Sequence, residues 1–198
     1  TEKIKLANSD ITAIVTAAHD TDLETNRNNP DSIVPEAELL IILPKGSSIK
    51  QSDIMPTLPD ANDDSPYDVD AHAMAVGDIN GDGLDDIFVG HGWDTNQGQQ
   101  GYALIQQTDG SFIVDKSSFY SEIVNYNSDM LLDVALVDVN NDGYDDIIGG
   151  YDGDVTSPIF LNDNGTFNKD NIITLPNSYY GAGNQMHMKT MPADFDKD

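Results

Sequence analysis

Two acidic segments of the chain, residues 78–86 and 138–146, carry oxygen-bearing side chains at alternating positions. Counted from the first Asp, each segment has Asp or Asn at positions 1, 3, 5 and 9 and Gly at position 6. Alternate positions of a short loop can point inward together, and the backbone carbonyl at position 7 can join them. Ca²⁺ prefers six to eight hard oxygen ligands of this kind. We therefore predict two complete calcium sites, with the ligands Asp78, Asn80, Asp82, the carbonyl of Leu84, Asp86, Asp138, Asn140, Asp142, the carbonyl of Tyr144 and Asp146.

The remaining positions of each segment also fit a metal loop. Gly83 and Gly143 stand at position 6, where the loop turns sharply and a positive φ costs little without a Cβ. Three carboxylates converge in each loop, and because they repel one another we expect cation binding to be coupled to ordering of the loop. We predict that Asp85 and Asp145, at position 8, face outward and are not ligands. A third segment repeats only positions 1, 3 and 5 and predicts a truncated third site at Asp194, Asp196 and Asp198.

Two other interpretations of these segments can be weighed against the calcium loop. An EF-hand shares positions 1, 3, 5 and 6, but it needs an acidic residue at position 12 and a following helix. Position 12 is Val89 in the first segment and Gly149 in the second, and a dockerin-like loop fails for the same reason. Acidic segments rich in Asp-Gly can also be solvated turns, but the aligned repetition argues against that interpretation here. Since β-type apolar runs follow both loops, we expect each loop to close a β-hairpin.

The elements that must position these loops are short apolar runs bounded by Gly, Asn, Asp and Pro, which are typical of strands. One run precedes each loop, a second follows it, and a third leads into an Asp-Gly or Asn-Gly pair typical of a tight hairpin. About four strands in each 55 to 60 residues indicate a propeller or a related array. We predict an all-β fold of β-propeller blades, each a four-stranded antiparallel sheet, in an incomplete propeller. The runs are 71–76, 87–89 and 102–105 in one unit and 132–137, 147–148 and 158–161 in the other, with turns at 109–112 and 164–167.

This pattern divides the chain into four predicted units. Complete blades cover residues 71–130 and 131–185, and residues 186–198 would begin a further, truncated blade. Residues 1–70 are predicted to form a degenerate or partial N-terminal blade followed by a linker.

Within the N-terminal unit the signals are weaker. We expect a strand over residues 11–18, a long insertion over 19–36, a hairpin over 39–48 and an extended, Pro- and Asp-rich connection over 46–70. The alternative is a degenerate acidic loop without the turn Gly, formed by Asp20, Asp22 and Glu24.

The composition narrows the classes of partner and compartment. The 198 residues include 35 acidic and 9 basic side chains, which gives a formal charge of −26, and two bound calcium ions would neutralise only four of these charges. A nucleic-acid partner is therefore not expected. The sequence has no apolar run near 18 residues, so insertion into a membrane is not expected either. The chain has no Cys, but an extracellular module can use calcium in place of disulfides as its stabilising cross-link.

The repeated motif resembles a known family. Residues 76–90 with 104–112, and equally the second loop with 160–167, resemble the FG-GAP/VCBS repeat of integrin α-subunit propellers and many bacterial surface proteins. The resemblance implies a propeller fold, bound calcium, and an extracellular location, secreted or at the cell surface. A closed propeller typically needs about four to eight blades, so we expect the chain to be part of a larger protein whose remaining blades are its partners. The expected function is a recognition, adhesion or structural module, and the alternative is a propeller part of a carbohydrate-active enzyme such as a polysaccharide lyase.

If the units are blades, the face opposite the calcium loops is the expected binding surface. An exposed aromatic side chain among amides could stack on a sugar or anchor a protein loop, so we expect a protein or carbohydrate ligand there. The alternative is that these aromatic side chains pack between blades. None of the four His residues has the spacing of a catalytic or zinc motif, so we expect no enzymatic activity in this chain. The candidate surface residues are Trp93, Asp94, Asn96, Gln97, Tyr126, Tyr151, Asp152, Asp154, Tyr179 and Tyr180.

Overall fold

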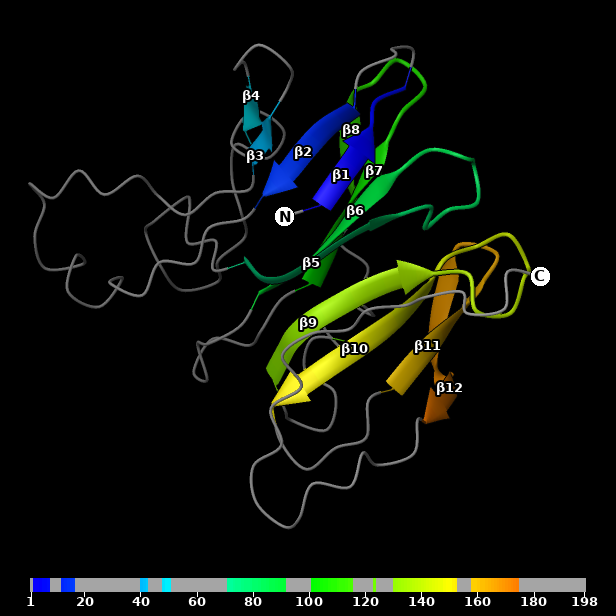
Figure 1. Cartoon of the computed structure of the whole chain (residues 1–198). Helices are drawn as coiled ribbons and strands as arrows, with labels where there is room; N and C mark the ends of the chain where they lie inside the picture. Colours follow the sequence, from blue (N-terminus) through cyan, green and yellow to red (C-terminus); the bar gives the residue numbers. More distant parts are fainter. Residues whose placement is uncertain are drawn as a thin grey trace, which may run out of the picture.

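The computed structural model forms three four-stranded antiparallel sheets within the residues it describes (Figure 1). The all-β class and the four-stranded antiparallel blades predicted from the sequence are confirmed. The described residues are 2–7, 12–16, 40–42, 48–50, 71–91, 101–115, 123, 130–152 and 158–174.

The second and third sheets repeat one plan. In each, consecutive strands are neighbours, and an acidic loop joins the first strand to the second. The second sheet contains β5 (Ala71–Gly77), β6 (Asp86–His91), β7 (Gly101–Gln106) and β8 (Phe112–Asp115). The third sheet contains β9 (Met130–Val137), β10 (Asp146–Asp152), β11 (Pro158–Asp163) and β12 (Thr166–Thr174). Each strand predicted around the two loops therefore has a counterpart in the structure.

The second strand of each of these two sheets is buried on both faces. Ile87, Phe88 and Val89 of β6 are fully buried, and so is Ile147 of β10. A strand covered on both faces reads as a continuous apolar run instead of an alternating one, and this is the pattern that follows each acidic loop. The burial fixes the end of each loop, because the last loop residue is also the first residue of the buried strand.

The first sheet follows the same order with shorter strands. It contains β1 (Glu2–Lys5), β2 (Thr12–Thr16), β3 (Leu40–Ile42) and β4 (Ser48–Lys50). The strand expected over 11–18 and the hairpin expected over 39–48 are both present.

Two details of the N-terminal expectation are wrong. Residues 48–50 belong to β4, where Lys50 pairs with Leu40, and not to an extended connection. The strand β1 was not predicted, because only Ile4 is apolar between the exposed Lys3 and Lys5. Pairing with β2 and full burial of Ile4 hold this short segment in a strand despite its weak local signal.

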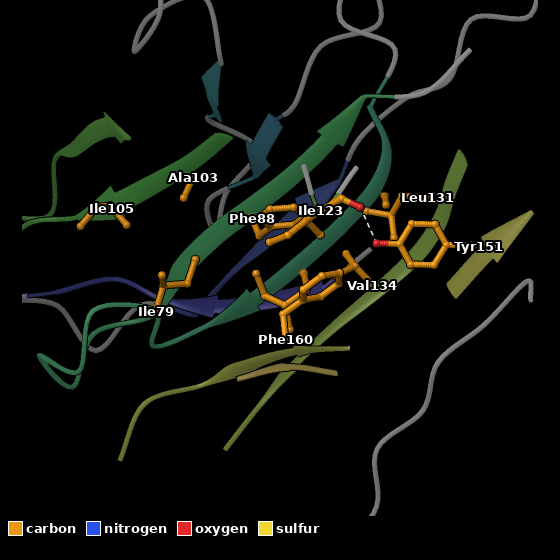
Figure 2. Close-up of a cluster of buried hydrophobic side chains, with 12 residues drawn as sticks. Ile79, Phe88, Ala103, Ile105, Ile123, Leu131, Val134, Tyr151 and Phe160 are labelled. Atoms are coloured by element: carbon orange, nitrogen blue, oxygen red, sulfur yellow. Dashed lines mark hydrogen bonds between the residues drawn. The ribbon is translucent and has the colours of Figure 1, made fainter. Parts of the chain in front are cut away.

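Neighbouring sheets pack through their first strands. β5 contacts β9, and β1 contacts β5, so equivalent strands of successive sheets lie side by side (Figure 1). The core between the second and third sheets is drawn from both (Figure 2). Its buried members are Ala73, Ala75, Ile79, Phe88, Ala103, Ile105, Ile123, Leu131, Val134, Ile147, Tyr151 and Phe160.

Tyr151 is part of this core and not of an exposed binding face, so its predicted role as a surface aromatic is wrong. Its side chain is fully buried, and its hydroxyl donates a hydrogen bond to the backbone carbonyl of Ile123 (Figure 2). For this residue, the alternative interpretation of the sequence, in which the aromatic side chains pack between blades, is confirmed.

Candidate metal centre

The two acidic loops occupy the same place in successive sheets. The first loop (residues 78–86) joins β5 to β6, and the second loop (residues 138–146) joins β9 to β10. Gly83 and Gly143, at position 6, have φ values of 82° and 90°. A residue with a Cβ is strained at such angles, so the Gly predicted at the sharp turn is required there.

In the first loop, the backbone wraps around the carboxylate at position 1. The Asp78 carboxylate accepts hydrogen bonds from the backbone N–H groups of Gly81 at 2.8 Å, Asp82 at 3.1 Å and Gly83 at 2.7 Å. These three donors hold the Asp78 carboxylate on the inner side of the turn. The second loop repeats two of these bonds, because Asp138 accepts from Asp142 at 3.1 Å and from Gly143 at 2.8 Å.

The side chains at positions 3 and 5 are joined to each other. Asn80 Nδ2 donates to Asp82 Oδ2 at 3.1 Å, and Asn80 Oδ1 accepts from the backbone N–H of Asp82 at 3.0 Å. Asp82 Oδ1 also accepts from the backbone N–H of Leu84 at 2.9 Å. Asn140 and Asp142 form the corresponding pair in the second loop, with distances of 2.9 and 3.0 Å. Positions 1, 3 and 5 thus lie within one hydrogen-bonded turn in both loops.

The carboxylate at position 9 is buried and ties the loop to the third strand of its own sheet. Asp86 Oδ1 accepts from the backbone N–H of Gln106 at 2.8 Å, and Oδ2 accepts from that of Ile79 at 3.1 Å. Asp146 accepts in the same way from Asn162 at 2.8 Å and from Val139 at 2.9 Å. Both carboxylates have no exposed surface.

This burial changes the acidity of the position 9 carboxyl groups. It raises the pKa of Asp86 to about 7, against the opposing effect of its two backbone hydrogen bonds, and the nearby charges of Asp82 and Asp78 raise it further. The pKa of Asp146 is raised by the same causes, first by burial. The carboxylates at positions 1, 5 and 9 therefore lie close enough together to repel one another.

The donor set of each loop fits a hard divalent cation. It combines carboxylate oxygens with an amide oxygen and a backbone carbonyl, and a cation would offset the repulsion at the buried position 9. Considering His, Cys, Asp and Glu alone, no group of three or more among the described residues is arranged to hold a metal ion. In the structure the carboxylates of Asp78 and Asp82 accept hydrogen bonds from backbone N–H groups of their own loop.

The residues at position 8 do not face outward as predicted, because each contacts the preceding sheet. Asp85 Oδ2 accepts a hydrogen bond from the backbone N–H of Lys5 at 2.7 Å. Asp145 Oδ2 accepts one from the backbone N–H of Asp78 at 2.7 Å, and the Asp145 N–H donates to the Asp78 carbonyl at 3.0 Å. The sequence alone shows neither partner, since these contacts join residues 80 and 67 positions apart.

Two buried amide side chains of the third strands reinforce the same junctions, and the sequence analysis did not single them out. Gln106 Nε2 donates to the carbonyls of Asp85 at 2.7 Å and Lys5 at 3.1 Å. Asn162 Nδ2 donates to the carbonyls of Ile79 at 2.7 Å and Asp145 at 3.0 Å. A signal was available, because a polar side chain follows the apolar run just before each tight turn.

Several predicted residues lie outside the described part of the chain. They are the truncated third site at Asp194, Asp196 and Asp198, and the surface candidates Trp93, Asp94, Asn96, Gln97, Tyr126, Asp154, Tyr179 and Tyr180.

Comparison with known families matches a stretch of the chain that contains both loops. Residues 78–148 match the FG-GAP-like repeat, from the first Asp of the first loop to the third residue of β10. This part of the chain is similar to the FG-GAP-like repeat family. The resemblance predicted from the motif is thus confirmed, and no curated protein matches the chain. FG-GAP-like repeats are typically extracellular. Within the described residues, the structure has no helix long and apolar enough to cross a bilayer.

Proposed function

We propose that the chain is a calcium-binding β-propeller segment in which the first and second loops each hold one Ca²⁺. The observation that carries the proposal is the buried carboxylate at position 9 of both loops. Two further carboxylates of the same loop lie near Asp86, and two lie near Asp146. Their charges disfavour ionisation of the buried carboxyl group. A bound cation would balance these charges.

In this proposal the ion cross-links the two ends of a hairpin connection. Positions 1, 3 and 5 precede the turn Gly, whereas the carbonyl at position 7 and the carboxylate at position 9 follow it. When bound, the ion supplies a positive charge shared by all five groups. Asp86 and Asp146 connect the loop to the third strand of their sheet, so closing the loop also fixes β7 or β11. Metal binding therefore contributes to folding of the sheet.

Thermal or urea unfolding of the metal-free protein, with and without added calcium, tests this function. At a free calcium concentration 100 times the dissociation constant, each site should add about 2.7 kcal/mol to the free energy of unfolding. The variant Asp82→Asn with Asp142→Asn should lose this stabilisation. Asp170→Asn replaces an exposed acid on β12, outside the loops, and removes one negative charge where the loop variant removes two; it should retain the stabilisation. Equal curves with and without calcium for the wild type would overturn the assignment.

We further propose that the segment works outside the cell, secreted or on the cell surface, as a recognition or adhesion module with the remaining blades of a larger protein. The typical location of FG-GAP-like repeats supports this compartment. The formal charge of −26 supports a protein or carbohydrate ligand over nucleic acid, because like charges repel. Screening the calcium-loaded protein against glycan and extracellular-matrix arrays tests it. Binding that is abolished by chelation would support the proposal, and no binding on either array would count against it.

A further inference from the structure

The first loop contacts residues of the second loop, although the two belong to different sheets. Asp145, at position 8 of the second loop, contacts Asp78, at position 1 of the first. Its carboxylate accepts from the Asp78 N–H at 2.7 Å, and its own N–H donates to the Asp78 carbonyl at 3.0 Å. Both backbone groups of a predicted calcium ligand are thus held by one residue of the other loop.

A second contact joins the two loops at Tyr144. Its ring lies against Gly81, at position 4 of the first loop, so closely that a Cβ on Gly81 would come within 2.6 Å of Tyr144 Cδ1. The equivalent position of the second loop carries Asn141, with a φ of 60° and a side chain. The Tyr144 ring thus explains why the first loop has Gly where the second tolerates a larger residue.

The third sheet contacts positions 2 and 3 of the first loop, Ile79 and Asn80, which lie between Asp78 and Gly81. Asn162 Nδ2 donates to the carbonyl of Ile79 at 2.7 Å, and Ile79 itself is buried in the core between the sheets. The tight turn after β11 lies near Asn80, whose Cα would be 3.6 Å from a Cβ on Gly165. Positions 1 to 4 of the first loop therefore all contact the third sheet or the second loop.

We propose that the two calcium loops are energetically coupled, with Asp145 and Tyr144 acting as positioning residues for the first loop. This inference rests on the proposed calcium binding. The carbonyl of Tyr144 and the carboxylate of Asp146 are proposed ligands of the second ion, and Asp145 lies between them. An ion in the second loop fixes Asp145, and a fixed Asp145 reduces the entropy lost when Asp78 is ordered. Calcium in the second loop therefore raises the affinity of the first loop, and the effect is reciprocal.

The chain provides a matched control for this coupling. Asp85 holds the same position in the first loop, and its hydrogen bond of 2.7 Å to a backbone N–H of the preceding sheet is equivalent. The N–H that it holds belongs to Lys5, however, and the residues that follow Lys5 do not form an acidic DxDxDG loop. Asp85→Ala and Asp145→Ala thus remove equivalent contacts, but only Asp145→Ala disturbs a calcium ligand of another loop.

The test is a calcium titration of the ¹⁵N-labelled chain by NMR, in which the amide signals of Gly83 and Gly143 report the two loops separately. Asp138→Ala removes a ligand from the second loop and should weaken calcium binding at Gly83 about tenfold. In the Asp145→Ala background, the same change should weaken binding clearly less than about tenfold, because the side-chain hydrogen bond to Asp78 is already lost while the backbone bond and the Tyr144 ring remain. If Asp138→Ala unfolds the third sheet, Asp142→Asn serves in its place.

Three controls make the result decisive. In the Asp85→Ala background, Asp138→Ala should still weaken calcium binding at the Gly83 amide about tenfold. In the Asp145→Asn background, which keeps the acceptor oxygen, most of this weakening should return. Because coupling is reciprocal, Asp78→Ala should weaken calcium binding at the Gly143 amide by the same factor by which Asp138→Ala weakens it at the Gly83 amide. Both amides should respond to calcium in the wild type. If they do but Asp138→Ala leaves the calcium affinity measured at Gly83 unchanged, the proposed coupling is wrong and the proposed calcium binding stands. If neither signal responds to calcium, the proposed function itself fails.

Discussion

Replacing Ile79 by Ala tests how the first loop is joined to the third sheet. Ile79 is 1% exposed at position 2 of the loop and packs in the core between the second and third sheets. The change removes three buried carbon atoms, worth about 2.4 kcal/mol at about 0.8 kcal/mol each. The cavity left between the sheets brings the loss to about 3 to 4 kcal/mol, within the usual range for Ile→Ala.

The matched control is Val139→Ala, at position 2 of the second loop. Val139 is 38% exposed, so its truncation should cost less than about 1 kcal/mol. Urea unfolding of the calcium-saturated proteins, followed by far-UV circular dichroism, gives both values. A loss for Ile79→Ala no larger than that for Val139→Ala would refute the reasoning, because it would mean that the first loop does not pack against the third sheet.

Three further predictions follow from the loops and their junctions. Asn162→Ala should destabilise the protein by about 2 to 4 kcal/mol in urea unfolding, because it leaves two carbonyls of the sheet junction without their donor; an effect below 1 kcal/mol would contradict the junction. Gly81→Ala should displace the Tyr144 ring and weaken calcium binding at the Gly83 amide, whereas Asn141→Ala should spare that amide, as NMR titration can check. The pKa of Asp86 is raised from 3.8 to about 7 in the folded protein without metal. Between these pH values the folded protein keeps a proton on Asp86 that the unfolded chain has lost, so this contribution to stability is fully present below about pH 4 and is lost as the pH rises through about 7. Metal-free protein should therefore lose stability over this range, measured as the difference from Asp86→Asn, and a gain with rising pH would contradict the shift.

The local features of the fold could be predicted from the sequence because their causes are local. The turn at Gly83 requires a positive φ, and the run Ile87 to Val89 is apolar throughout because both faces of β6 are covered. The pairing of the strands on either side of each loop follows from the hairpin. These features recur in both repeats, and because they recur, they could be distinguished from chance patterns in the sequence.

The features that the sequence did not predict depend on neighbouring sheets. Asp145 was expected to face solvent, but it accepts a hydrogen bond from Asp78, which lies 67 positions earlier in the chain. Tyr151 was assigned to an exposed face and is buried, with its hydroxyl bonded to the carbonyl of Ile123. No local pattern distinguishes these partners from water. Asn162 does have a local signal, as a polar side chain between an apolar run and a tight turn, but its partner Ile79 lies 83 positions earlier and no local pattern indicates it.

The most direct test of the account is a crystal structure of the chain grown with saturating calcium, with the ions identified by anomalous scattering. The account predicts one ion in each loop, with oxygen atoms of Asp78, Asp82 and Asp86 at about 2.3 to 2.6 Å in the first loop. The second loop should show the same arrangement at Asp138, Asp142 and Asp146. Loops that keep only their internal hydrogen bonds at saturating calcium, with no ion between these carboxylates, would contradict it.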